Sequence, residues 1–338
     1  MAELLHPGLL LIASGLALAA LTGAAGAALT LAAPAAAIGL VLAMPDGVAW
    51  RGTFLGYPVV PWTVDALSRL FALVFSIMAF GGGLFALRQE NRVEVPAAFV
   101  YAGSAIGVTL AGDFLTVFAF WELMALGSTL VIWSGGTRAA YRASMRYLMV
   151  HLAGGVVLMA GIAGHVAGTG STAFERIALD SPAHWLVLAG FLVNAGAPPL
   201  SAWLPDAYPE ASWSGTVFLS AFTTKTAVFV LIRTFPGTEL LVFVGLFMIF
   251  YGIVYALLEN DMRRILAYSI VNQVGFMIVG IGIGTEMSLN GAAAHAFTHI
   301  LYKALLLMSA GAVLYETGRR KCTDLGGLFR TMPLTMVC

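Results

Sequence analysis

The chain has 338 residues, of which 60% are apolar and 10% are charged, and its formal net charge is zero. Soluble domains carry about 25% charged residues, so this composition excludes a water-soluble globule, and the mean hydropathy of +0.91 indicates lipid as the main solvent. The balanced charge leaves no basic surface for nucleic acid. The cysteines, Cys322 and Cys338, lack metal-ligand spacing and do not form a disulfide framework.

Eleven apolar segments are long enough to cross a bilayer as helices, which takes about 20 residues each. The predicted fold is therefore all-α, a polytopic membrane helix bundle. The first segment has no basic start of the kind that signal peptides carry, so it is predicted to be a retained helix. The predicted spans cover roughly 5–22, 25–44, 66–87, 95–112, 114–134, 145–167, 184–204, 212–234, 239–258, 263–284 and 288–315.

The segment 45–65, between the second and third spans, has a different composition. It contains Trp50, Tyr57 and Trp62, two prolines and short runs of β-forming residues. Aromatic rings of this kind gather at membrane interfaces. We expect an ordered interfacial loop, with a β-hairpin as the alternative form.

Lysine and arginine are distributed unevenly between the predicted loops. Loops after even-numbered spans carry Arg51, Arg176 and Arg233, whereas those after odd-numbered spans carry Arg88, Arg92, Arg138, Arg142, Arg146, Arg263, Arg264, Arg319, Arg320, Lys321 and Arg330. The positive-inside rule places the second set in the cytoplasm. We therefore expect a multi-pass protein of a bacterial plasma membrane with its N-terminus on the outer face.

The seventh span is predicted to be broken. Asn194 is followed by a glycine and by Pro198 and Pro199, and proline removes a backbone donor and clashes with the preceding turn. One interpretation is a packing kink. The other is a broken helix that lines a watery cavity, which is where irregular backbone is tolerated at membrane depth.

Two single charges lie deep inside apolar spans, where each costs a few kcal/mol. Glu122 lies near the middle of the fifth span and Lys225 halfway along the eighth. A protonated structural glutamate and a permanent ion pair are the plain alternatives. The functional interpretation is a pair of groups that exchange protons.

His295, His299 and Lys303 are spaced four residues apart on the eleventh span. This spacing places them on one helix face, over about 12 Å at 1.5 Å per residue. The row predicts a proton relay, with packed core histidines as the alternative. A metal site is disfavoured because there is no HExxH motif and no cysteine or carboxylate nearby in the sequence. No cofactor motif or nucleophile is present, so we predict neither a cofactor nor chemistry beyond ion translocation.

At these residues the chain resembles the antiporter-like membrane subunits of respiratory complex I, of Mrp-type sodium/proton antiporters and of membrane-bound hydrogenases. The resemblance covers the fifth to the eleventh span and is greatest to the Mrp D-type subunit. The matching segments are Phe120-Trp121-Glu122-Leu123-Met124, Trp203-Leu204-Pro205-Asp206-Ala207, Lys225 with the segment ending at Arg233, Asp261-Met262-Arg263-Arg264 with the five residues that follow, and His295, His299 and Lys303.

The resemblance implies fourteen helices with two inverted five-helix repeats. The N-terminal helices and outer loop would then occupy 1–94, the first half-channel repeat 95–234, and the start of the second repeat 235–338. Lys225 would relay a proton toward the centre, and the row on the eleventh span would pass it to a broken twelfth span. Met332 looks like the start of that span, so we expect the gene to continue past Cys338.

The sequence departs from the family pattern at two positions. Asn194 stands nine residues before Trp203, where the family usually has a lysine, and Ser201 stands two residues before Trp203, where it has a histidine. Glu122 therefore lacks its usual cation. Either Lys225 takes over this role or the first half-channel is inactive.

Three functions remain open at this stage. The first is a proton-conducting subunit of an Mrp-like cation/proton antiporter, with other membrane subunits as partners and protons, with or without sodium, as the ions. The second is a subunit of a complex I-like NADH:quinone oxidoreductase or membrane hydrogenase. The third is a structural paralogue that conducts nothing.

Overall fold

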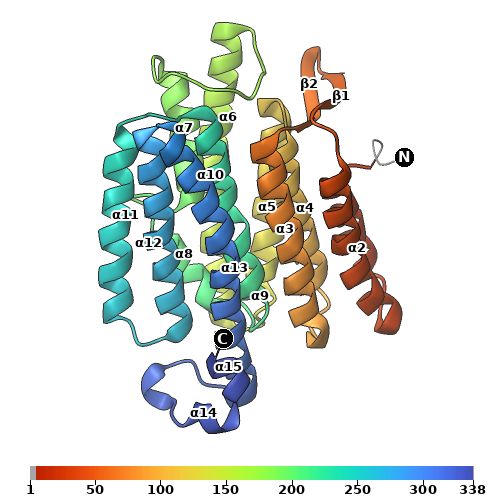
Figure 1. Cartoon of the computed structure of the whole chain (residues 1–338), viewed down its shortest axis with the longest axis vertical. Helices are drawn as coiled ribbons and strands as arrows, with labels where there is room; N and C mark the ends of the chain where they lie inside the picture. The colour runs from red at the N-terminus through yellow and green to blue at the C-terminus, as the bar shows by residue number, and fades with distance from the viewer. Residues whose placement is uncertain (1–4, 338) are drawn as a thin grey trace.

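The computed structural model describes residues 5–337, which form a bundle of helices with a small β-hairpin at one end (Figure 1). The helices are α1 (Pro7–Leu18), α2 (Gly23–Ala43), α3 (Ala66–Phe85), α4 (Glu94–Leu110), α5 (Phe114–Trp133), α6 (Arg138–Thr169), α7 (Pro182–Ala195), α8 (Trp203–Ala207), α9 (Gly215–Ala221), α10 (Thr223–Thr234), α11 (Leu240–Leu258), α12 (Met262–Ile283), α13 (Glu286–Thr317), α14 (Leu328–Thr331) and α15 (Pro333–Val337). Short 3-10 turns are η2 (Ala86–Arg88), η3 (Tyr208–Glu210) and η4 (Cys322–Asp324).

The predicted spans all have helical counterparts within residues 5–337. Eight helical segments there are long and apolar enough to cross a membrane, and three shorter apolar helices, α1, α4 and α7, occupy the remaining predicted spans. The predicted twelfth span starts at Met332, and the structure has the five-residue helix α15 there. Cys338 lies outside the described residues.

The segment 45–65 contains the β-hairpin that was the alternative to an irregular interfacial loop. Its strands are antiparallel, β1 (Gly47–Phe54) and β2 (Tyr57–Val64). Asp113, which caps α5, anchors the hairpin to the bundle, because its carboxylate accepts hydrogen bonds from the backbone of Val60 at 2.7 Å and of Thr116 at 2.8 Å. Asp65 then caps α3 and pairs with Arg233 at 2.6 Å. The hairpin is thereby fixed to three helices.

The pKa of Asp65 is set by competing effects at this end. Partial burial acts to raise it. The hydrogen bond from the backbone of Ser68 and the adjacent Arg233 guanidinium outweigh burial, so the pKa lies below its ordinary value.

Small residues let the helices pack closely. A Cβ on Gly8 of α1 would lie 2.5 Å from the carbonyl oxygen of Gly103 on α4, and one on Gly245 of α11 would lie 2.6 Å from that of Gly275 on α12. In both cases the glycine faces backbone of the neighbouring helix, so any side chain at that position would clash with it. Such approaches are typical of membrane helices, whose association depends on packing rather than on expulsion of water.

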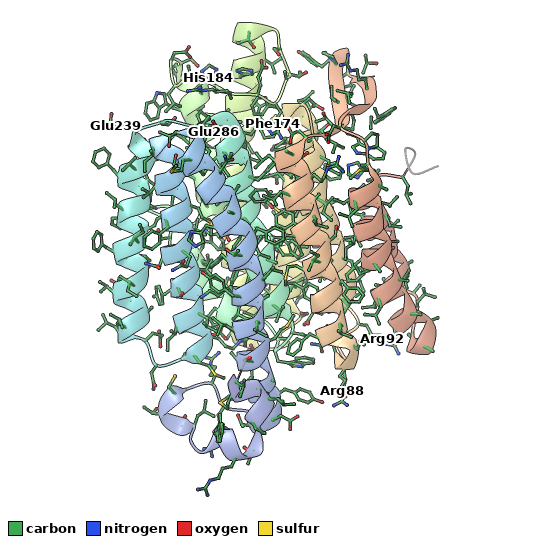
Figure 2. The ribbon with its side chains drawn as sticks, viewed as in Figure 1. Arg88, Arg92, Phe174, His184, Glu239 and Glu286 are labelled. Atoms are coloured by element: carbon green, nitrogen blue, oxygen red, sulfur yellow. The ribbon has the colours of Figure 1, made fainter. Side chains whose placement is uncertain are left out.

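The two ends of the bundle differ in charge. Arg88 and Arg92 lie at the end opposite the hairpin, whereas His184, Glu239 and Glu286 lie at the hairpin end (Figure 2). We call these the basic end and the hairpin end. At the basic end Arg146 pairs with Asp206, and Arg264 and Arg320 both pair with Glu210. The arginines of the odd-numbered loops thus gather at one end, as the loop charges predicted.

Candidate functional site

Lys225 lies at a break that the sequence analysis did not predict. The eighth span is two helices, α9 and α10, because Phe222 departs from helical geometry with φ −104° and ψ −68°. The Nζ of Lys225 donates to the carbonyl oxygen of Ser220 at 2.7 Å, across this break. The lysine is fully buried. A helix break frees backbone carbonyls, and the ammonium supplies one of them with a donor.

The predicted row on the eleventh span faces α12. His299 and Lys303 are buried on α13, and His295 is partly buried. The Nε2 of His295 lies 2.9 Å from the side-chain oxygen of Gln273, and the Nζ of Lys303 donates to the hydroxyl of Ser269 at 2.8 Å. The row is therefore held by polar side chains of α12.

His299 stands between these two groups without a hydrogen-bond partner on either ring nitrogen among residues 5–337. Its ring centroid is 6.1 Å from that of His295 and 5.1 Å from that of Tyr302. Buried polar atoms that have no protein partner are commonly hydrogen-bonded to internal water.

The structure brings Lys225 to the same row. Helix α10, which carries Lys225, packs against both α12 and α13. Neither Lys225 nor Lys303 forms an ion pair within the described part of the chain. Buried ammonium groups without a carboxylate are costly, so this cluster suits proton exchange better than fixed charge.

Glu122 lies on α5 against α6. A Cβ added to Gly155 would lie 2.0 Å from the Oε1 of Glu122, so the carboxyl group occupies the space that this glycine leaves open. That oxygen is buried and has no hydrogen-bond partner among the described residues. Lys225 binds Ser220 instead, and no ion pair joins it to Glu122 within the described residues. Only an indirect coupling of Glu122 and Lys225 fits this geometry.

Comparison with known proteins found a matching family and similar individual proteins. A family model described as "NADH:quinone oxidoreductase/Mrp antiporter, TM" matches residues 111–338. The chain belongs to this family. NADH-quinone oxidoreductase subunit N of Desulforudis audaxviator is 30% identical over 332 residues, covering 89% of this chain and 66% of that protein. The D-type subunit of the Na⁺/H⁺ antiporter of Alkalihalophilus pseudofirmus is 29% identical over 308 residues, covering 82% and 62%.

The fold is also that of the family. The structure of respiratory complex I from Thermus thermophilus contains a chain that superposes on this one with a TM-score of 0.86 at 23% identity, covering 100% of this chain and 76% of that one. This antiporter-family chain is therefore a multi-pass membrane protein. It spans just under two thirds of the length of the two curated relatives above.

The predicted break in the seventh span lies between α7 and α8. Asn194 is buried at the end of α7, and neither atom of its amide group has a partner among residues 5–337. The hydroxyl of Ser201, also buried, has none either. Pro198 is partly buried between these two positions. The residues that depart from the family pattern thus lie together at the break, with unused hydrogen-bonding capacity.

Sequence reasoning missed a hydroxyl cluster beside Lys225. The hydroxyl of Thr223 lies 2.5 Å from that of Tyr101 on α4 and 3.2 Å from that of Tyr147 on α6. The backbone N–H of Thr223 donates to Tyr101 at 2.9 Å, which satisfies a donor at the helix break. The sequence signal was weak: serines and threonines from Ser220 to Thr226 that compete for backbone hydrogen bonds.

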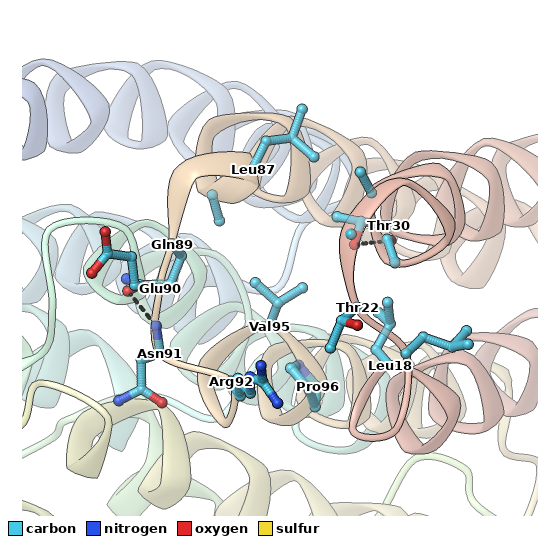
Figure 3. A pocket seen from close by; sticks show the side chains of 15 residues that line it. Leu18, Thr22, Thr30, Leu87, Gln89, Glu90, Asn91, Arg92, Val95 and Pro96 are labelled. Atoms are coloured by element: carbon cyan, nitrogen blue, oxygen red, sulfur yellow. Dashed lines mark hydrogen bonds between the residues drawn. The ribbon is translucent and has the colours of Figure 1, made fainter.

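One surface pocket lies away from these groups. It has a volume of about 340 Å³ and is lined by the turn after α1, the start of α2 and the connection from α3 to α4 (Figure 3). Gln89, Glu90, Asn91 and Arg92 give it a polar side at the basic end. None of the predicted proton-path residues lines it, because their polar atoms lie between packed helices.

Proposed function

We propose that this chain is a proton-translocating membrane subunit of a multisubunit cation/proton antiporter of the Mrp kind. The observation that supports it is the buried cluster of Lys225, His295, His299 and Lys303 between α10, α12 and α13. Glu122 and Lys225 serve the first half-channel, in residues 95–234. The row on α13 opens the second, in residues 235–338. Other membrane subunits are the partners.

A second function is supported by the relative from Desulforudis audaxviator, whose name is that of an NADH-quinone oxidoreductase subunit. In that case an electron-transfer reaction in partner subunits drives the same proton path. The driving force distinguishes these two functions. A sodium gradient drives proton flux in the first, whereas quinone reduction drives it in the second.

The test uses the intact complex reconstituted in vesicles with a pH-sensitive dye. The chain has three lysines, which supply a matched control. Lys225→Met and Lys303→Met should each lower proton flux by about tenfold or more, as removal of a proton-transfer group does. Lys321→Met, at an exposed lysine of the basic end, should leave flux unchanged. Equal flux in all three variants would refute the proposal and favour the structural paralogue.

We also propose that the basic end lies in the cytoplasm of a bacterial cell, with the N-terminus on the outer face. The gathering of arginines at that end supports this orientation. Cys322 is an exposed thiol at the basic end. In a Cys338→Ser background, a membrane-impermeant maleimide should label Cys322 in inverted vesicles and not in intact cells. Labelling of intact cells would reverse the topology.

A further inference from the structure

Helix α12 packs against both α11 and α13 (Figure 1), and hydrogen-bonded side chains join the three helices. The amide nitrogen of Asn272 donates to the backbone carbonyl oxygen of Ile249 on α11 at 2.9 Å. The Nε2 of Gln273 donates to the side-chain oxygen of Asn272 at 2.8 Å. The Gln273 oxygen lies 2.9 Å from Nε2 of His295 and 3.2 Å from the hydroxyl of Tyr302, both on α13. Each of these contacts is a direct hydrogen bond, and we call Asn272 and Gln273 the amide pair.

The backbone carbonyl of Ile249 determines the direction of these hydrogen bonds. A carbonyl oxygen only accepts, so Asn272 turns its NH₂ group toward Ile249 and its oxygen toward Gln273. The Asn272 oxygen also only accepts, so Gln273 turns its NH₂ group toward Asn272 and its oxygen toward α13. The Gln273 oxygen then requires donors from both His295 and Tyr302. The hydrogen of the neutral His295 ring therefore lies on Nε2.

The opposite tautomer of His295 does not fit these contacts. With its hydrogen on Nδ1, the ring would turn the lone pair of Nε2 toward the Gln273 oxygen at 2.9 Å, and the hydrogen bond would be lost. A Gln273 amide turned the other way would offer His295 a donor, but would bring two oxygens together at the 2.8 Å contact with Asn272. Asn272 is buried and Gln273 is partly buried. An acceptor that loses its donor in such a place is costly, so one tautomer is selected.

The fixed hydrogen leaves His295 one nitrogen for proton exchange. Nε2 keeps its hydrogen in both the neutral and the charged ring, so a proton that arrives binds at Nδ1 and leaves from Nδ1. A histidine that conducts through its ring instead takes a proton at one nitrogen and releases one from the other. His299 differs from His295, because neither of its ring nitrogens has a partner among residues 5–337. The two histidines of the row therefore differ in what they can do with a proton.

We propose that the amide pair positions His295 with its hydrogen on Nε2, so that this ring holds a proton at Nδ1 and does not pass protons through itself. This inference rests on the proposed function, because it assigns roles within the row on α13. Uptake forms one N–H bond at Nδ1, and release breaks the same bond, so the ring returns to its starting tautomer. His299 is then the imidazole of the row that can conduct through its ring.

The first test determines the tautomer of His295 in the unmodified complex. The intact complex is prepared with isotope-labelled histidine, and the His295 signals are those that a His295→Gln variant lacks. The two neutral tautomers differ in the NMR shifts of their ring nitrogens and carbons, so solid-state spectra recorded on the neutral ring distinguish them. We expect the form with the hydrogen on Nε2. The form with the hydrogen on Nδ1, or a mixture of both, would overturn the proposal.

The second test changes the amide pair and measures both the tautomer and the proton flux of the reconstituted complex. Gln273→Met keeps the length of the side chain but removes the acceptor, so His295 should populate both tautomers and flux should fall about tenfold or more. Asn272→Leu leaves the Gln273 amide free to turn over, and should change both quantities in the same direction. Tyr302→Phe is the matched control, because it removes the other donor to the same Gln273 oxygen and leaves the amide pair in place. It should keep the tautomer and the flux of the unmodified complex.

A changed tautomer together with lower flux in the two amide-pair variants, with the control unchanged, supports the proposal. Lower flux with an unchanged tautomer would show a purely structural role, and a changed tautomer with normal flux would show that the fixed hydrogen has no effect on transport; either result overturns it. Equal losses in Tyr302→Phe would overturn it as well. Failure of the proposed function is seen separately, because Lys225→Met and Lys303→Met would then keep their flux. Subunit content and thermal unfolding check assembly, and if a variant does not assemble, the tautomer of the unmodified complex still decides.

Discussion

Replacing Gly155 by alanine should disable Glu122 while leaving the fold intact. The new Cβ would lie 2.0 Å from Oε1 and 2.8 Å from the carboxyl carbon of Glu122, whereas ordinary contact begins near 3.4 Å. The carboxyl group must therefore retreat by about 1.4 Å, the difference between 3.4 Å and 2.0 Å. It is the far end of a flexible side chain, so the shift costs about 1 kcal/mol. Alanine recovers a similar amount as the better helix former.

The expected loss of proton flux is much larger than the expected loss of stability. Misplacing a reacting group by about 1 Å can lower a rate by about a hundredfold. We therefore expect Gly155→Ala to lower proton flux by up to about a hundredfold in the reconstituted complex. Its thermal unfolding midpoint in detergent should remain within a few degrees of that of the unmodified protein.

Gly161→Ala, six residues further along α6, is the matched control. Its Cβ would lie 2.6 Å from the backbone nitrogen of Val187 and 2.8 Å from the carbonyl oxygen of Ala183, and this backbone cannot move aside. Overpacking of this kind costs about 1–3 kcal/mol, so this variant should lose stability. Unchanged flux in Gly155→Ala, or equal loss of stability in both variants, would show that the position of Glu122 has been misread.

The remaining predictions concern stability, and thermal or acid unfolding in detergent checks them. Arg263→Met should cost about 3 kcal/mol or more, because the buried guanidinium donates to three backbone carbonyls that would each lose a partner, whereas Arg264→Met should cost less than about 1 kcal/mol. Asp65 has a pKa below its ordinary value, so its stabilisation is complete above about pH 4 and is lost as the pH falls through the folded-state pKa. Asp65→Asn keeps a capping oxygen but loses the pair with Arg233, and should flatten this acid dependence. Asp113→Ala should cost about 1–2 kcal/mol as a lost helix cap and expose the hairpin to proteases; an unchanged cleavage pattern would contradict its anchoring role.

Relations within one helix could be read from the sequence. Hydropathy located the spans, and a proline pair with a glycine located the break after α7. Four-residue spacing placed His295, His299 and Lys303 on one face, because helical geometry depends only on position along the chain. The aromatic and β-forming segment 45–65 likewise indicated an ordered loop, with the observed hairpin as its alternative form.

Relations between helices were decided by the tertiary structure. The sequence suggested Lys225 as the cation for Glu122, but this lysine binds Ser220 across a helix break at Phe222. No proline or glycine at this position indicates the break. Nothing local shows that Glu122 fills the space that Gly155 of α6 leaves open. These neighbours depend on how each helix is rotated and how closely its backbone approaches the next, which packing over the whole bundle determines.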